Sequence, residues 1–117
     1  MVFRLMQGDV ELGRSELASL DEGMGMVSGP FRPSPGYSSV EPLFRELSEA
    51  IEARSVPDEL YAARDALDLR VVGPGDLLVP TEFVIVYDFG EELDRVLEAK
   101  LADVDAWKRA HRSRDAG

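Results

Sequence analysis

The sequence predicts an α+β fold in which a mostly antiparallel, curved sheet of about five strands carries helices packed on one face. Segments with strand and helix patterns follow one another in the order β-β-β-α-α-β-β-α, and the connections between them are short, which favours antiparallel neighbours. The length of 117 residues is typical of a single domain. We therefore expect one domain over residues 1–110 and a frayed tail over residues 111–117.

A β-hairpin is expected at the N-terminus. Apolar residues recur at every second position in Val2–Gln7 and again in Val10–Leu17, as they do in strands with one buried face. Gly8 and Asp9 between them are residue types that tolerate the backbone angles of a tight hairpin turn.

A third strand, Met24–Phe31, is expected after a turn at residues 20–23. Gly25 and Gly29 are unusual inside a strand because they leave no side chain to pack. They predict a bulge, or a place where another backbone or a ligand comes close. The three prolines at positions 30, 33 and 35 should end this strand, because proline lacks an amide proton.

Two helices are expected next. In Ser39–Arg54 the apolar residues fall on one helical face, and Ser38 with Glu41 has the spacing of a capping box. Asp58–Ala66 has the composition of a second, shorter helix.

The remaining elements follow from the same patterns. Leu67–Val72 is expected to be a strand, and Gly73–Asp76 a reversal. Leu77–Phe89 is the most strand-like segment; its centre is apolar on both faces, and Pro80 predicts a bend. Glu91–Trp107 shows apolar residues at helical spacing and is expected to form the last helix.

Composition excludes several classes of function. The formal net charge of -10 argues against nucleic-acid binding, which needs a basic face, and suits a basic protein partner. No stretch is long and apolar enough to span a membrane, and the N-terminus lacks the pattern of a signal peptide, so we expect a cytoplasmic protein. The chain has no cysteine, which removes disulfides and thiolate chemistry.

Catalytic signatures are missing from the sequence. His111 is the single histidine, so a histidine-based triad or metal site is not expected. The acidic groups at positions 21 and 22, 65 and 68, and 88, 91 and 92 lie at turns or at expected helix starts, where acids cap helices and interact with their dipoles. We expect no cofactor.

The stretch Gly23–Tyr37 contains four glycines, three prolines and two aromatic residues. Its prolines stiffen the backbone, and its aromatic side chains are of the type that anchors protein interfaces. The candidate interaction residues are Phe31, Arg32 and Tyr37, together with Trp107. The alternative is that these rings belong to the core, where large aromatics usually contribute their area.

The segment MGMVSGPFRP, with Leu20 and Asp21 just before it, resembles a family of small bacterial proteins. The resemblance covers Asp21 to Pro33. It implies a stand-alone bacterial domain and names no active residues.

Three functions fit these observations. The first is a non-enzymatic protein-interaction domain, of the kind formed by acidic immunity or antitoxin proteins that cover a basic partner. The second is a small-molecule binding domain or a carboxylate-dependent enzyme, with a pocket between the sheet and the Ser39–Arg54 helix. The third is a structural homodimer that pairs through an edge strand or through the last helix.

Overall fold

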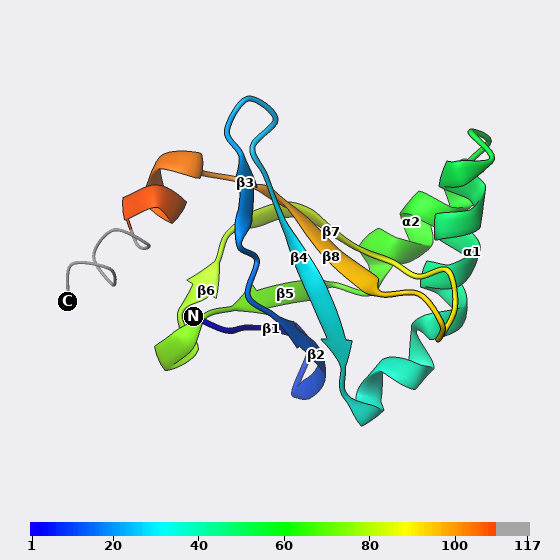
Figure 1. Ribbon diagram of the computed structural model, residues 1–117, viewed down its shortest axis with the longest axis horizontal. Coiled ribbons are helices and arrows are strands. Elements are labelled where there is room, and N and C mark those ends of the chain that lie inside the picture. Colours follow the sequence, from blue (N-terminus) through cyan, green and yellow to red (C-terminus); the bar gives the residue numbers. More distant parts are fainter. Residues whose placement is uncertain (110–117) are drawn as a thin grey trace.

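The computed structural model describes residues 1–109 of the chain, and Figure 1 shows the arrangement of their elements. All strand pairs in this part are antiparallel. The strands are β1 (Phe3–Gln7), β2 (Val10–Ser15), β3 (Ser19–Asp21), β4 (Met26–Pro33), β5 (Leu69–Val72), β6 (Leu78–Val79), β7 (Thr81–Tyr87) and β8 (Arg95–Leu101). The helices are α1 (Glu41–Glu52), α2 (Asp58–Ala66), the 3-10 turns η1 (Pro35–Ser39) and η2 (Pro74–Asp76), and a short helix over 104–109.

The sheet nearly closes into a barrel. Its strand order is β6-β5-β1-β2-β4-β8-β7, with β3 paired to β4. β6 pairs with β5 and β7 pairs with β8, and only Pro80 separates β6 from β7 in the chain. The two ends of the strand path are therefore joined through the bend at Pro80. The α+β class and antiparallel pairing are confirmed, whereas the predicted number of about five strands is too small.

The N-terminal hairpin is confirmed, with β1 and β2 on either side of Gly8 and Asp9. The predicted turn at residues 20–23 begins later than expected, because Ser19–Asp21 forms β3 and pairs with the start of β4. This short strand was missed, as three residues are too few to show an alternating pattern.

Gly29 marks a close approach of two backbones, as predicted. A Cβ atom at this position would lie 2.8 Å from Oγ of Ser15 and 2.9 Å from the backbone nitrogen of Leu17. β4 therefore crosses the end of β2 at a distance that only glycine permits. The prediction that the prolines end this strand is wrong for Pro30 and Pro33, which lie inside β4. Pro30 is opposite Val96 of β8, and no strand is paired with it on its other side among the described residues.

Both central helices are confirmed within a few residues of the predicted bounds. The predicted capping box is wrong. The residue at the N-cap of α1 is Val40, no side chain caps the helix, and Ser38 donates instead to the carbonyl oxygen of Pro35 at 3.2 Å. The reason is that η1 runs directly into α1, so that the backbone N–H of Val40 bonds to the carbonyl of Tyr37.

The predicted helix over Glu91–Trp107 is wrong. Residues Arg95–Leu101 form β8, between β4 and β7, and within the predicted range 91–107 only residues 104–107 are helical. Leu97, Ala99 and Leu101 are buried while their neighbours are partly exposed, which is the alternation of a strand. The same leucines also fit a helical period, and the sequence pattern did not separate the two.

The barrel has two covered ends. η1, α1 and α2 lie together over the end where β4 and β7 finish, which is the right-hand side of Figure 1. The helix over 104–109 lies at the other end, where the ring of Trp107 stacks on Phe3 with 4.9 Å between ring centroids. Residues 84–86 of β7 are buried on both faces, as predicted, because α1 packs outside them. No helix within residues 1–109 is long and apolar enough to cross a membrane.

Candidate functional site

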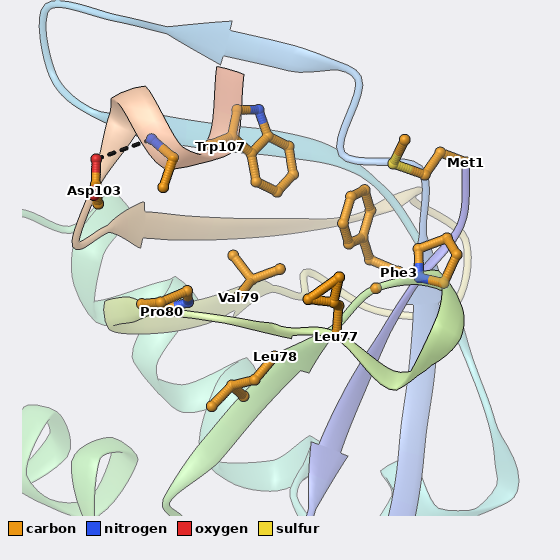
Figure 2. A pocket seen from close by; sticks show the side chains of 11 residues that line it. Met1, Phe3, Leu77, Leu78, Val79, Pro80, Asp103 and Trp107 are labelled. Atoms are coloured by element: carbon orange, nitrogen blue, oxygen red, sulfur yellow. Dashed lines mark hydrogen bonds between the residues drawn. The ribbon is translucent and has the colours of Figure 1, made fainter. Parts of the chain in front are cut away.

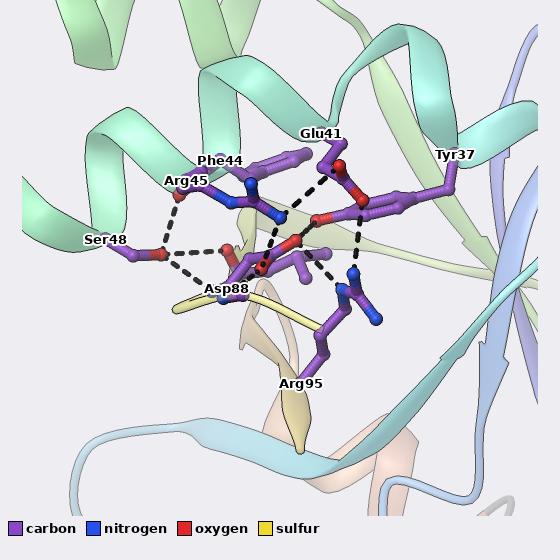
Figure 3. Close-up of polar contacts among 9 residues, drawn as sticks. Tyr37, Glu41, Phe44, Arg45, Ser48, Asp88 and Arg95 are labelled. Carbon is purple, nitrogen blue, oxygen red and sulfur yellow. Dashed lines mark hydrogen bonds and ion pairs between the residues drawn. The ribbon is translucent and has the colours of Figure 1, made fainter. Parts of the chain in front are cut away.

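A buried carboxylate, Asp88, lies directly after β7, facing α1 and η1 (Figure 3). Its Oδ2 accepts hydrogen bonds from the hydroxyl of Tyr37 at 2.8 Å and from Nε of Arg95 at 2.9 Å. Its Oδ1 accepts a hydrogen bond from the backbone N–H of Gly90 at 2.9 Å. A buried charge is tolerated only when it is paired and hydrogen-bonded, and these three donors meet that condition.

Glu41 and two arginines extend this arrangement to the surface. Arg95 donates through Nη2 to Oε2 of Glu41 at 3.1 Å. Nη2 of Arg45 lies 3.4 Å from Oε1 of Glu41 and 3.8 Å from Oδ1 of Asp88. The guanidinium of Arg95 also lies over the ring of Tyr37, 5.5 Å from its centroid. We call these five residues, Tyr37, Glu41, Arg45, Asp88 and Arg95, the Asp88 cluster.

Ser48 fixes the backbone of Asp88 to α1. Its Oγ accepts a hydrogen bond from the backbone N–H of Asp88 at 2.8 Å and donates one to the carbonyl oxygen of Phe44 at 2.7 Å. Ser48 is fully buried, and back-bonding to the preceding helical turn is a common way for a serine to satisfy its hydroxyl inside a helix. The cluster therefore joins η1, α1, the end of β7 and the start of β8.

Electrostatics keep Asp88 ionised. Burial alone would raise the pKa of its carboxyl, but the hydrogen bonds from Arg95, Gly90 and Tyr37 outweigh burial and leave the pKa below its usual value. Burial, and then the hydrogen bond to Asp88, raise the pKa of the Tyr37 hydroxyl far above its usual range. Tyr37 is thus a neutral donor and Asp88 a charged acceptor. A carboxylate that is ionised at neutral pH and hydrogen-bonded at both oxygens is suited to holding the fold together and not to proton transfer.

Buried side chains of α1 fill the space between the sheet and this helix, where a pocket was expected. Phe44, Leu47 and Ser48 of α1 are buried against β7. The cavity beside the Asp88 cluster is a shallow depression on its outer side, lined by Pro33, Ser34, Pro35, Tyr37, Ser38, Glu41, Glu91 and Arg95.

An apolar cavity of about 200 Å³ lies at the opposite end of the barrel (Figure 2). Phe3 and Trp107 line one side, and Leu77, Leu78 and Val79 line another. The carboxylate in its wall, Asp103, accepts a hydrogen bond from the backbone N–H of Ala106 at 2.9 Å and so caps the short helix over 104–109.

The four predicted interaction residues are not brought together. Phe31, Tyr37 and Trp107 are 4%, 1% and 7% exposed, so all three belong to the core. Phe31 and Tyr37 pack edge to face at 5.3 Å, whereas Trp107 lies at the far end of the barrel. Arg32 is exposed at the end of β4, and it is the one member whose side chain can meet a partner in this structure.

The position of Asp88 at a turn is predicted from the sequence, whereas its burial is not. The turn is real, because Oδ1 of Asp88 bonds the N–H of Gly90, but the other oxygen turns inward to Tyr37 and Arg95. Residues 1–109 contain no group of three or more His, Asp or Glu side chains placed to hold a metal ion. His111 and the predicted tail lie outside the described residues.

Comparisons of the chain with protein-family models, curated proteins and solved structures find no match. Function is therefore inferred from the residues of this chain alone.

Proposed function

We propose that the chain is a non-enzymatic protein-interaction domain that covers a basic protein partner, as acidic immunity and antitoxin proteins do. The observation that carries the proposal is a surface on α1 and α2, which we call the acidic helical surface. It consists of the exposed carboxylates Glu46, Glu49 and Glu52 of α1 and Asp58, Glu59 and Asp65 of α2.

Few cations compensate this surface. Residues 41–68 carry eight acidic and three basic side chains. Arg45 is engaged with Glu41, and Arg64 is engaged with Asp65 at 3.0 Å. The third basic side chain, Arg54, is exposed on the connection between the two helices. Carboxylates gathered in this way attract and orient a basic partner.

The acidic helical surface also stands on a rigid support. The Asp88 cluster and Ser48 fix α1 to the barrel. α2 is held by Arg64, whose guanidinium lies between the rings of Tyr61 and Phe83, at 5.1 and 4.8 Å from their centroids. A surface that is already ordered loses little conformational entropy when a partner binds.

The enzyme alternative has less support. It requires a deep pocket with at least two acids of raised pKa, as in general acid-base catalysis. The carboxylates Asp88 and Glu11 have a lowered pKa: in Asp88 hydrogen bonds outweigh burial, and Glu11 is bonded to Arg14 and Ser34. The apolar cavity contains one acid, Asp103, which caps a helix.

The test is affinity capture at low salt from an extract of the source cells. The wild-type chain is compared with a triple variant of α1, Glu46→Gln, Glu49→Gln and Glu52→Gln. An exposed ion pair contributes about 0.2–1 kcal/mol, so the loss of three lowers the affinity for the captured protein roughly threefold to a hundredfold. Added salt should weaken the complex, because exposed charges are screened.

A matched control removes the same charge elsewhere. Asp9→Asn, Glu16→Gln and Asp105→Asn change exposed acids outside α1 and α2 and should leave capture unchanged. If the control loses the partner as strongly as the α1 variant, only net charge matters and the proposed surface is wrong. If no partner is recovered by the wild-type chain, the interaction function itself is contradicted.

A further inference from the structure

A second surface, at the other end of the barrel, has the opposite character. Met1, Val2, Leu77 and Leu78 are exposed large apolar residues, and we call them the β6 patch. Met1, Leu77 and Leu78 line the apolar cavity of Figure 2, and Val2 lies on the depression beside it that Gly73–Gly75 also line. Leu77 and Leu78 are 61% and 56% exposed. Exposed apolar side chains that are contiguous in this way mark interaction surfaces.

Charge is sparse around this patch. Residues 71–80, VVGPGDLLVP, include one charged side chain, Asp76, and Arg4 forms an ion pair with it. The cavity and the depression add two further charged side chains: Asp103, which caps the helix over 104–109, and Arg14, which is paired with Glu11 at 3.1 Å. The chain as a whole carries a formal charge of -10. Two copies of an acidic protein repel each other, and the repulsion is weakest when the two surfaces that meet carry few charges. A second copy therefore approaches the β6 patch at the least electrostatic cost.

The backbone of β6 adds a second reason. β6 pairs with β5 along one side, and no strand among residues 1–109 pairs with its other side. An open edge with apolar side chains is a template for pairing with another strand. Antiparallel pairing of β6 with β6 of a second copy places the same patch on both partners, which is the self-complementary arrangement of a two-fold dimer.

We infer that the β6 patch is the contact surface for a second copy of this chain, with Leu77 and Leu78 at its centre. A basic partner finds no charge to pair with on the apolar β6 patch. The same patch on a second copy matches the β6 patch in both size and chemistry. The inference does not depend on the proposed function, because the two surfaces lie at opposite ends of the barrel.

The experiment is sedimentation velocity of the full chain over a wide range of concentrations, at low and at high salt. We expect a monomer–dimer equilibrium that shifts toward the dimer as salt increases, because screening reduces the repulsion between two acidic copies. This is the reverse of the salt effect on a basic partner, so the two interfaces are distinguishable. A chain that stays monomeric at millimolar concentration in high salt would overturn the inference.

Leu78→Lys tests the residues. The substitution should raise the dimer dissociation constant at least tenfold, although it makes the net charge less negative. Leu93→Lys is the control, because Leu93 is 58% exposed on the loop between β7 and β8. The dissociation constant of this variant should stay within twofold of wild type. A dimer that tolerates Leu78→Lys, or that Leu93→Lys disrupts equally, contradicts the assignment. Circular dichroism checks folding, and Leu77→Lys replaces Leu78→Lys if that variant does not fold.

Discussion

Asp88→Asn removes the charge at the centre of the Asp88 cluster and nearly preserves its shape. The asparagine keeps one carbonyl oxygen, so its NH₂ group must face either the N–H of Gly90 or the donors Tyr37 and Arg95. In both orientations two donors point at each other. The Arg95 side chain, 12% exposed, then keeps Glu41 as its ion-pair partner in the cluster.

The expected cost is about 3–5 kcal/mol of the free energy of unfolding, as for breaking one member out of a buried ion pair. This is a large part of the roughly 5–15 kcal/mol that stabilises a typical domain. Tyr37→Phe removes a single hydrogen bond to a charged group and should cost about 1.5–3 kcal/mol. Asp65→Asn breaks the ion pair with Arg64 and should cost less than about 1 kcal/mol, because the Asp65 side chain is 64% exposed.

Urea unfolding, followed by the fluorescence of Trp107 and by circular dichroism, measures these free energies. Trp107 is a suitable probe because it is the single tryptophan and is buried on Phe3, far from the substituted residues. If Asp88→Asn costs no more than Asp65→Asn, the Asp88 cluster does not stabilise the fold and our interpretation of its charges is wrong.

Local geometry and charge give three further predictions. Because the pKa of Asp88 is lowered in the folded protein, Asp88 stabilises the fold at pH values above its unfolded pKa of about 3.9, and this stabilisation is lost as the pH falls through the folded pKa. On acidification the wild type should therefore lose its stability advantage over Asp88→Asn. Urea unfolding at several pH values measures this. Burial, with Glu98 nearby, raises the pKa of Tyr87 to about 12. The contribution of Tyr87 to stability is therefore complete below pH about 10 and is lost as the pH rises through about 12. In a titration followed by tyrosinate absorbance, Tyr87→Phe should remove a late-titrating group, and an unchanged titration curve would count against this. Gly29→Ala should lower the free energy of unfolding in urea by about 1–3 kcal/mol, because the new Cβ has no room beside Leu17. At Gly23 a Cβ would lie 3.6 Å from the nearest atom, so Gly23→Ala should cost under about 0.5 kcal/mol. Equal costs would refute the close approach of the two backbones at Gly29.

The parts of the fold that the sequence predicted are those in which a local pattern and the tertiary structure agree. The first hairpin, α1, α2 and the bend at Pro80 each carry a signal within a few residues, such as a turn pair or an apolar face. Gly29 was informative because a glycine inside a strand commonly marks a bulge or a close approach of another backbone.

The failures have physical causes. In β8 the residues Leu97 and Leu101 are four positions apart, which fits one face of a helix and one face of a strand, and sheet pairing on both sides decided the outcome. β3 is too short to show a period. Pro30 and Pro33 were expected to stop a strand, but a proline is accepted where the strand has an open side.

The candidate site was less predictable than the fold. Tyr37 and Asp88 are 51 residues apart in the chain, and an aspartate followed by a glycine nearby is typical of an exposed turn. Only the closure of the barrel brings η1 and the start of β8 to the same side chain. The acidic helical surface, by contrast, follows from the outward positions of two predicted helices, so it was accessible from the sequence.

Mapping the bound surface by NMR distinguishes the acidic helical surface from every other face of the molecule. Amide signals of the labelled chain are followed while the captured partner, or a lysine-rich peptide as a defined probe, is added at low salt. The proposed function predicts that the largest shifts fall within residues 41–68, on α1 and α2, and that the triple α1 variant loses them. Shifts concentrated on β1, β2 or β6, or spread evenly over the chain, would contradict it.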